Sequence, residues 1–152
     1  MTTWTERLAE LGIELPEVAA PLAAYVPAVR SGSHVYVSGQ LPFVAGTLAA
    51  TGKVGAEVSP EDAKRYARIS GLNALAAVHA LVGIDSVVRV VKAVGFVASA
   101  EGFTGQPAVV NGASELFGEV FGDAGVHARS AVGVSELPLG APVEVELIVE
   151  VN

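Results

Sequence analysis

The segment Val143–Val151 alternates strictly between two kinds of side chain. Its odd positions are all valine or leucine, and its even positions are Glu144, Glu146, Ile148 and Glu150. A period of two residues is typical of a β-strand with one face against the core. The chain therefore needs a sheet that has one covered face, and it needs other elements to cover it.

Two segments have the pattern of helices that cover such a face. The first begins at Ser59-Pro60-Glu61-Asp62, because serine caps free amides, proline suits the first helical position and acids oppose the helix dipole. It is predicted to end near Val82, at Gly83, and the second to span Ala108–Phe121. The expected inner faces are Ala63, Ala67, Ser70, Ala74, Ala77 and Leu81 in the first, and Val110, Ala113, Phe117 and Phe121 in the second.

The other apolar segments predict strands. A hairpin is expected around Ser31-Gly32-Ser33, and a valine-rich strand buried on both faces follows the first long helix. The expected strands are Val26–Arg30, His34–Ser38, Val87–Val97, Ala128–Val134 and Val143–Val151. A short N-terminal helix through Leu11, a loop over 14–25 and an irregular connection over 39–59 complete the chain. This order favours an α+β fold with one mixed sheet and two helices on one face, in one domain over 1–152.

The composition is apolar and poor in charge. Hydrophobic residues make up 51% of the 152, and charged residues 16%, below the usual figure of about 25%. The longest apolar stretch, Leu72–Ile84, is shorter than the roughly 20 residues of a membrane span. A net charge of −7 disfavours nucleic acid and anionic membranes, and the absence of cysteine excludes thiol chemistry. We therefore expect a cytoplasmic homo-oligomer that buries apolar surface between subunits.

Arg129 is the strongest candidate for a binding residue. It is the only lysine or arginine after Lys92, in a region rich in carboxylates. A guanidinium among small residues suits the bidentate binding of a ligand carboxylate, and the alternative is a structural salt bridge to Glu144 or Glu146. If the last two strands pair around Pro138, Arg129 and Glu144 share a sheet face, although the sequence does not fix the register.

One serine motif is excluded as a nucleophile elbow. Gly112-Ala113-Ser114 lacks the closing glycine of that motif, and its serine lies within a predicted helix rather than at a turn between a strand and a helix. The spacing of residues alone indicates no Ser/His/Asp set. The three histidines, which are widely separated in sequence, also predict no metal site.

Several segments together resemble the RidA/YjgF family over nearly the whole chain. They are Tyr25, Ser38-Gly39-Gln40-Leu41-Pro42, Ala128-Arg129-Ser130-Ala131-Val132 and Val143-Glu144-Val145-Glu146. The stretches Asn111–Ser114 and His127–Gly133 resemble a divergent branch of that family rather than its central enzymes. The resemblance implies a chorismate-mutase-like α+β fold. It also implies a homotrimer whose sheets form a central barrel, with three ligand clefts between subunits.

The resemblance further implies a reaction and the roles of four residues. In central family members, an enamine or imine derived from an amino acid is hydrolysed to a 2-keto acid and ammonia. By this resemblance Arg129 holds the substrate carboxylate, Glu144 helps to position water, and Tyr25 and Gly39 line the cleft. The reaction requires an oriented water and a proton route, so no metal or cofactor is implied.

Two positions depart from the family pattern. Ala131 stands where central members usually have cysteine, so it can contribute only its backbone to the cleft. His127 stands where proline is common, and it adds a polar group. The alternative to a deaminase is therefore a non-catalytic or regulatory trimer that binds small carboxylates in the same cleft.

Overall fold

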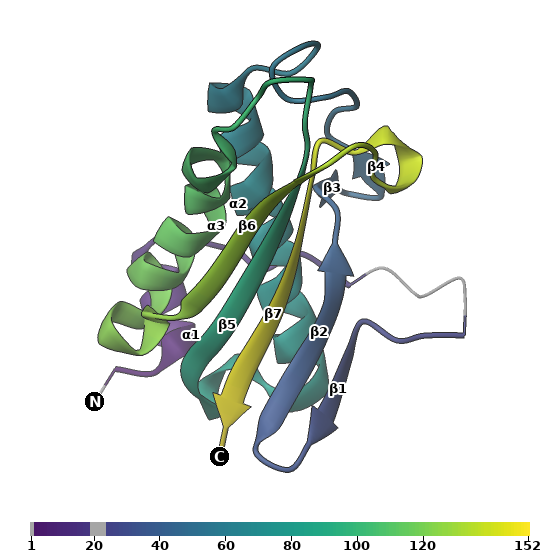
Figure 1. Ribbon diagram of the computed structural model, residues 1–152. Coiled ribbons are helices and arrows are strands. Elements are labelled where there is room, and N and C mark those ends of the chain that lie inside the picture. Colours follow the sequence, from purple (N-terminus) through teal and green to yellow (C-terminus); the bar gives the residue numbers. More distant parts are fainter. Residues whose placement is uncertain (1, 19–23) are drawn as a thin grey trace.

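The computed structural model describes residues 2–18 and 24–152 as one mixed sheet backed by helices (Figure 1). Residues 19–23 of the predicted 14–25 loop lie outside the described residues. The helices are α1 (Trp4–Glu10), α2 (Pro60–Val82) and α3 (Gln106–Phe121). The strands are β1 (Ala28–Ser31), β2 (His34–Gln40), β3 (Phe43–Val44), β4 (Thr47–Leu48), β5 (Val87–Ala98), β6 (Ala128–Val134) and β7 (Val143–Val151).

The five-stranded sheet has the order β1-β2-β7-β5-β6. Its neighbours are antiparallel except for β5 and β6, which run parallel and are joined by the crossover through α3. The sheet is therefore mixed and the α+β expectation is confirmed. The last two strands do not pair around Pro138, contrary to one expectation, because β5 lies between β6 and β7 and leaves β6 at the edge.

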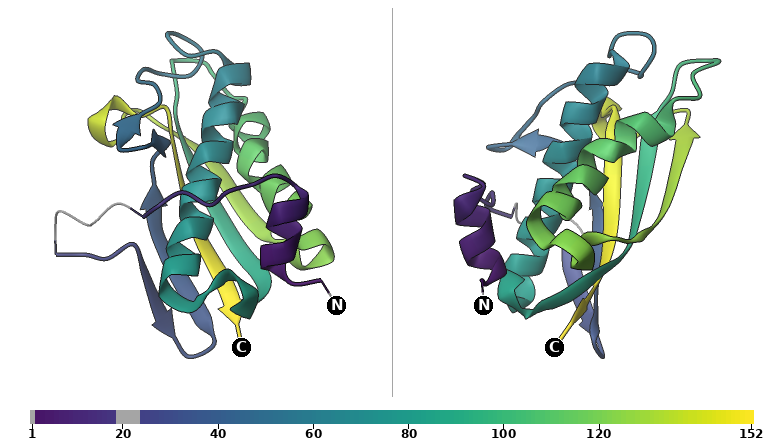
Figure 2. Two further views of the ribbon diagram at one scale, coloured as in Figure 1. Left: turned by 180° about the vertical axis from the view of Figure 1, so that it is seen from behind. Right: turned by 90° about the vertical axis from the view of Figure 1, so that its left-hand side faces the viewer.

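Helices α2 and α3 cover one face of the sheet, and α1 packs beyond them (Figure 2). The predicted small face of α2 is buried except for Leu81, which is 44% exposed near the C-terminal end of the helix. The small residues allow a close approach between helices. A Cβ on Gly112 of α3 would overlap the carbonyl of Lys64 in α2, so only glycine fits at this crossing.

Side chains cap the starts of α1 and α2, and Ser59 of α2 is the predicted cap. Thr3 caps α1 in a capping box with Glu6, and Ser59 accepts a hydrogen bond from the Asp62 amide at 3.1 Å. The indole of Trp4 donates to the carbonyl of Val87 at 2.7 Å, which attaches α1 to the start of β5.

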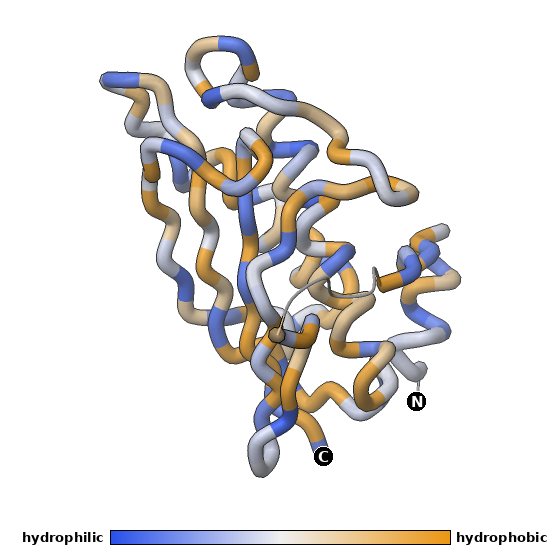
Figure 3. Tube along the Cα trace, turned by 90° about the vertical axis from the view of Figure 1, so that its right-hand side faces the viewer, coloured by the Kyte–Doolittle hydropathy of each residue, from blue (hydrophilic) through white to orange (hydrophobic). Residues whose placement is uncertain are grey.

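The opposite face of the sheet is covered by no described residue of the chain. Strand β5 was expected to be buried on both faces, but Val88 is 44% exposed because both long helices lie on one side. Other large apolar side chains, Val29, Tyr36 and Val132, are also 43–51% exposed. Along the strands, apolar positions alternate with polar ones (Figure 3). We call the sheet surface opposite the helices the open face.

The connection over 39–59 contains a small hairpin that the sequence did not predict. Strands β3 and β4 are two residues each and turn at Ala45 and Gly46, both of which have positive φ. The side-chain amide of Asn73 in α2 donates to the carbonyls of Leu41 and Phe43, each at 3.0 Å, and fixes the start of the hairpin. In the described ranges, no helix is both long and apolar enough to cross a membrane.

Candidate functional site

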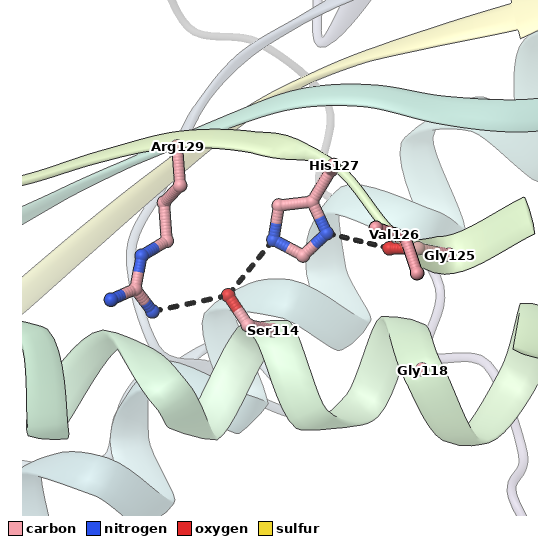
Figure 4. A pocket seen from close by; sticks show the side chains of 6 residues that line it. All are labelled: Ser114, Gly118, Gly125, Val126, His127 and Arg129. Atoms are coloured by element: carbon pink, nitrogen blue, oxygen red, sulfur yellow. Dashed lines mark hydrogen bonds between the residues drawn. The ribbon is translucent and has the colours of Figure 1, made fainter. Parts of the chain in front are cut away.

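A shallow, open groove of about 330 Å³ lies between the edge strand β6 and helix α3. Its lining residues are Ser114, Gly118, Gly125, Val126, His127 and Arg129. Figure 4 shows the side chains of Arg129 and His127 pointing from the strand segment toward Ser114 on the helix. The groove therefore brings together Arg129 and His127, two of the residues predicted from the sequence.

Arg129 lies on the face of the sheet that the helices cover. The parallel register places it beside Ala93, which is fully buried against the helices. Its Nη1 donates to Asn111 Oδ1 at 2.7 Å and to Ser114 Oγ at 3.3 Å. Its Nε and Nη2 donate to none of the described residues, so one edge of the guanidinium keeps a free pair of donors.

The alternative interpretation of Arg129 as half of a structural salt bridge is wrong for the described residues. Neither Glu144 nor Glu146 lies within ion-pair distance of it, since all the ion pairs found involve other residues. The partners of Arg129 are the neutral side chains of Asn111 and Ser114, which orient the guanidinium and leave its charge uncompensated. Such a cation suits a carboxylate ligand.

His127 is held on both sides of its ring. Its Nδ1 lies 2.6 Å from the carbonyl oxygen of Gly125, and its Nε2 lies 2.9 Å from Ser114 Oγ. A carbonyl oxygen only accepts, so Nδ1 carries the proton. In the neutral ring Nε2 then accepts the hydrogen bond from the Ser114 hydroxyl. The edge of the His127 ring also packs on Phe117, with ring centroids 5.6 Å apart.

Glu144 lies on the open face, away from this groove. Its neighbours Val143 and Val145 are buried against the helices, so the alternation of β7 turns Glu144 to the other side. Desolvation by burial, with a smaller contribution from the charge of Glu146, raises the pKa of the Glu144 carboxyl above its usual value. This carboxyl therefore keeps its proton to a higher pH than a free glutamate does, and its carboxylate is a stronger base.

Gly39 lies beside Glu144 rather than beside Arg129, and the residue after Tyr25 is hydrogen-bonded to the strand of Gly39. A Cβ built on Gly39 of β2 would lie 2.8 Å from the Glu144 carboxyl carbon, so glycine makes room for that side chain. Tyr25 precedes β1 and is 60% exposed. The Ser38 hydroxyl donates to the carbonyl of Val26 at 2.7 Å and ties the segment after Tyr25 to the residue before Gly39.

Within one chain, the predicted site residues therefore lie in two separate groups, on opposite sides of the sheet. Arg129 and His127 lie on the helix-covered side at the β6 edge, and Ala131 lies on the same side, packed partly buried against the core. Glu144 lies on the open face, with β5 between it and β6. The expectation that Arg129 and Glu144 share a sheet face is wrong. Through Phe96 of β5, Glu144 is in register with Val132, and Arg129, three residues before Val132, faces the other side of the sheet.

Sequence reasoning did not assign Asn111 and Ser114 to the site. Both lie on α3, three residues apart, and so face the same direction. That spacing, on the helix that leads directly to the strand of Arg129, was the available signal. Ser114 does lie in a helix, as expected, and it nevertheless contacts His127.

The chain belongs to the YjgF/chorismate mutase-like family. Its sequence profile, described as "YjgF/chorismate mutase-like, putative endoribonuclease", matches residues 5–151. Protein TCP17 of Trypanosoma cruzi is 47% identical over 149 residues, which are 95% of this chain and 92% of that protein.

Solved structures agree with this assignment. Atu1372 from Agrobacterium tumefaciens is 46% identical, with a TM-score of 0.89 over 99% of this chain and 94% of that one. E. coli TdcF, solved with bound serine, is 25% identical, with a TM-score of 0.66 over 90% of this chain and 94% of that one. The YjgF-type fold expected from the sequence is confirmed.

Proposed function

We propose that this protein hydrolyses small 2-imino acids, and the enamines that tautomerise to them, to 2-keto acids and ammonia. The observation that carries the proposal is the free Nε–Nη2 edge of Arg129. Arg129 lines an open groove, and none of the described residues accepts a hydrogen bond from its Nε or Nη2. Two parallel N–H donors match the two oxygens of a carboxylate.

A carboxylate on Arg129 fixes the position of the reacting carbon. In a 2-imino acid the imine carbon is bonded directly to the carboxylate carbon, so the clamp orients both together. Such positioning lowers the entropic cost of reaching the transition state. TdcF, the relative solved with serine, supports this ligand class, since an amino acid also carries a carboxylate and a nitrogen on the same carbon.

The reaction requires water and a base. Water adds to the imine carbon and gives a proton to the base, which passes it to the nitrogen to form the hemiaminal. The hemiaminal hydroxyl then gives its proton to the base, the carbon–nitrogen bond breaks as the nitrogen takes that proton, and ammonia and the keto acid leave. Glu144 is the base in this proposal, because its raised pKa brings the carboxyl closer to neutral pH, where a general base is most effective.

The two halves of the site meet between subunits in the proposed trimer. Arg129 comes from one chain, and Glu144 and Gly39 come from its neighbour together with Tyr25, because within one chain Arg129 and Glu144 lie on opposite sides of the sheet. The apolar side chains of the open face supply the surface for this assembly. A ring of three identical chains then repeats the same cleft three times.

The test is the rate of decay of freshly generated 2-iminopropionate with and without protein. We expect acceleration by the wild type and its loss in Arg129→Ala. Arg65→Ala is the matched control, since Arg65 pairs with Asp62 on the exposed surface of α2. A wild type that binds pyruvate but leaves the decay rate unchanged would support a non-catalytic carboxylate-binding trimer instead.

A further inference from the structure

Ser114 and His127 form a hydrogen-bonded pair that the proposed deamination does not use. Ser114 Oγ lies 2.9 Å from His127 Nε2, and the ring is fixed from behind by the Gly125 carbonyl, 2.6 Å from Nδ1. Both residues line the groove and are partly exposed. Figure 4 shows the hydroxyl between the imidazole and the guanidinium of Arg129.

The hydrogen-bond directions give each group a defined role. The Gly125 carbonyl only accepts, so the proton of the neutral ring is on Nδ1 and Nε2 is a free base. Ser114 therefore donates its hydroxyl proton to Nε2. A hydroxyl that donates to an imidazole held by a third group is the arrangement found in serine nucleophiles.

Arg129 adds a positive charge beside the same oxygen. Its Nη1 donates to Ser114 Oγ at 3.3 Å, which favours the negative charge that develops there when the proton leaves. The same guanidinium charge, beside the nucleophilic oxygen, also favours the negative charge of the tetrahedral intermediate formed on it.

We propose that Ser114 is the nucleophile of a second activity, the hydrolysis of small acyl esters, with His127 as its base. Ser114 Oγ forms a bond to the acyl carbon while its proton passes to His127 Nε2. The bond to the leaving oxygen breaks, and that oxygen takes the proton from His127. Water then attacks the acyl-serine, again giving a proton to Nε2. That proton returns to Ser114 Oγ as the carboxylic acid leaves.

The groove indicates the class of ester. Apart from Ser114, His127 and Arg129, the groove is lined by the uncharged residues Gly118, Gly125 and Val126. Val126 is 67% exposed. A Cβ on Gly118 would contact nothing within 4 Å, so the groove is open above the helix at this point. A short, uncharged ester with an apolar leaving group fits this surface.

Diisopropyl fluorophosphate tests the proposal, because it phosphorylates activated serines and releases fluoride. By intact mass and peptide sequencing, we expect one adduct per chain, on Ser114. Ser114→Ala removes it, and the exposed Ser130→Ala control keeps it. His127→Gln keeps hydrogen-bonding groups but no base, so labelling slows by about 10²-fold or more.

An unlabelled wild type, an adduct on another residue, or a His127→Gln variant labelled at the wild-type rate would each overturn the proposal. The labelling of wild type involves no mutation, so a folding defect in a variant does not affect that result. It also involves no imine. A protein that is labelled on Ser114 without deaminating, or that deaminates without being labelled, therefore separates the two proposals.

Discussion

Replacing Arg129 with lysine tests how the guanidinium holds its ligand. Lysine keeps the positive charge but removes the Nε–Nη2 fork, and it loses the bonds of 2.7 and 3.3 Å to Asn111 and Ser114 that orient the group. One charge-assisted hydrogen bond contributes about 1.5–3 kcal/mol. Its loss corresponds to a roughly 10- to 150-fold rise in the Kd for a small carboxylate.

Calorimetric titration with pyruvate, the keto acid expected as a product, measures this directly. We expect weaker binding in Arg129→Lys and still weaker binding in Arg129→Ala, with Arg65→Ala equal to the wild type. If Arg129→Lys binds pyruvate within about twofold of the wild type, the charge alone accounts for binding. The Nε and Nη2 donors of Arg129 would then not be what binds the carboxylate.

Three further changes test the open face and the packing. The pKa of the Glu144 carboxyl is raised in the folded protein, so the free energy of unfolding of the wild type falls as pH rises through that pKa. Glu144→Gln should therefore unfold at a higher urea concentration than the wild type at pH 7, with no such gain below about pH 4. Equal urea midpoints at pH 7 would contradict this. Gly39→Ala should push the Glu144 carboxyl aside and lower turnover by about 10²-fold with pyruvate binding retained, and unchanged turnover would refute this role for the glycine. In urea unfolding, Gly112→Ala should lower the free energy of unfolding by about 1–3 kcal/mol, because the new Cβ meets the Lys64 carbonyl. Gly118→Ala in the same helix should raise it by up to about 1 kcal/mol. Similar effects of the two substitutions would show that the helix crossing is not tight.

Patterns within single elements predicted most of the fold. The Ser59 cap, the stop at Gly83 and the alternation of Val143–Val151 are encoded locally, and the structure has all three. The β3–β4 hairpin was missed because its strands are two residues each and depend on Asn73, which lies about 30 residues away in sequence.

The site could be predicted as a set of residues but not as an arrangement. Arg129 was identifiable from its isolation among carboxylates, and Glu144 from the family resemblance. Their placement on opposite sides of the sheet depends on the registers in which β5 pairs with β6 and with β7, which are non-local and which the sequence pattern does not determine. The Ser114–His127 contact has the same origin, since it joins a helix to the segment before an edge strand.

The most direct test of a catalytic site shared between subunits is to mix two inactive variants. Arg129→Ala and Glu144→Gln chains, co-expressed with different tags and purified through both, give mixed oligomers, which are trimers in this proposal. If each site takes Arg129 from one chain and Glu144 from the next, random assembly of equal amounts restores about a quarter of the sites before selection. We therefore predict that 2-iminopropionate hydrolysis returns in the mixture although each variant alone is inactive. A mixture as inactive as its parents, with mixed trimers present, would contradict the shared site.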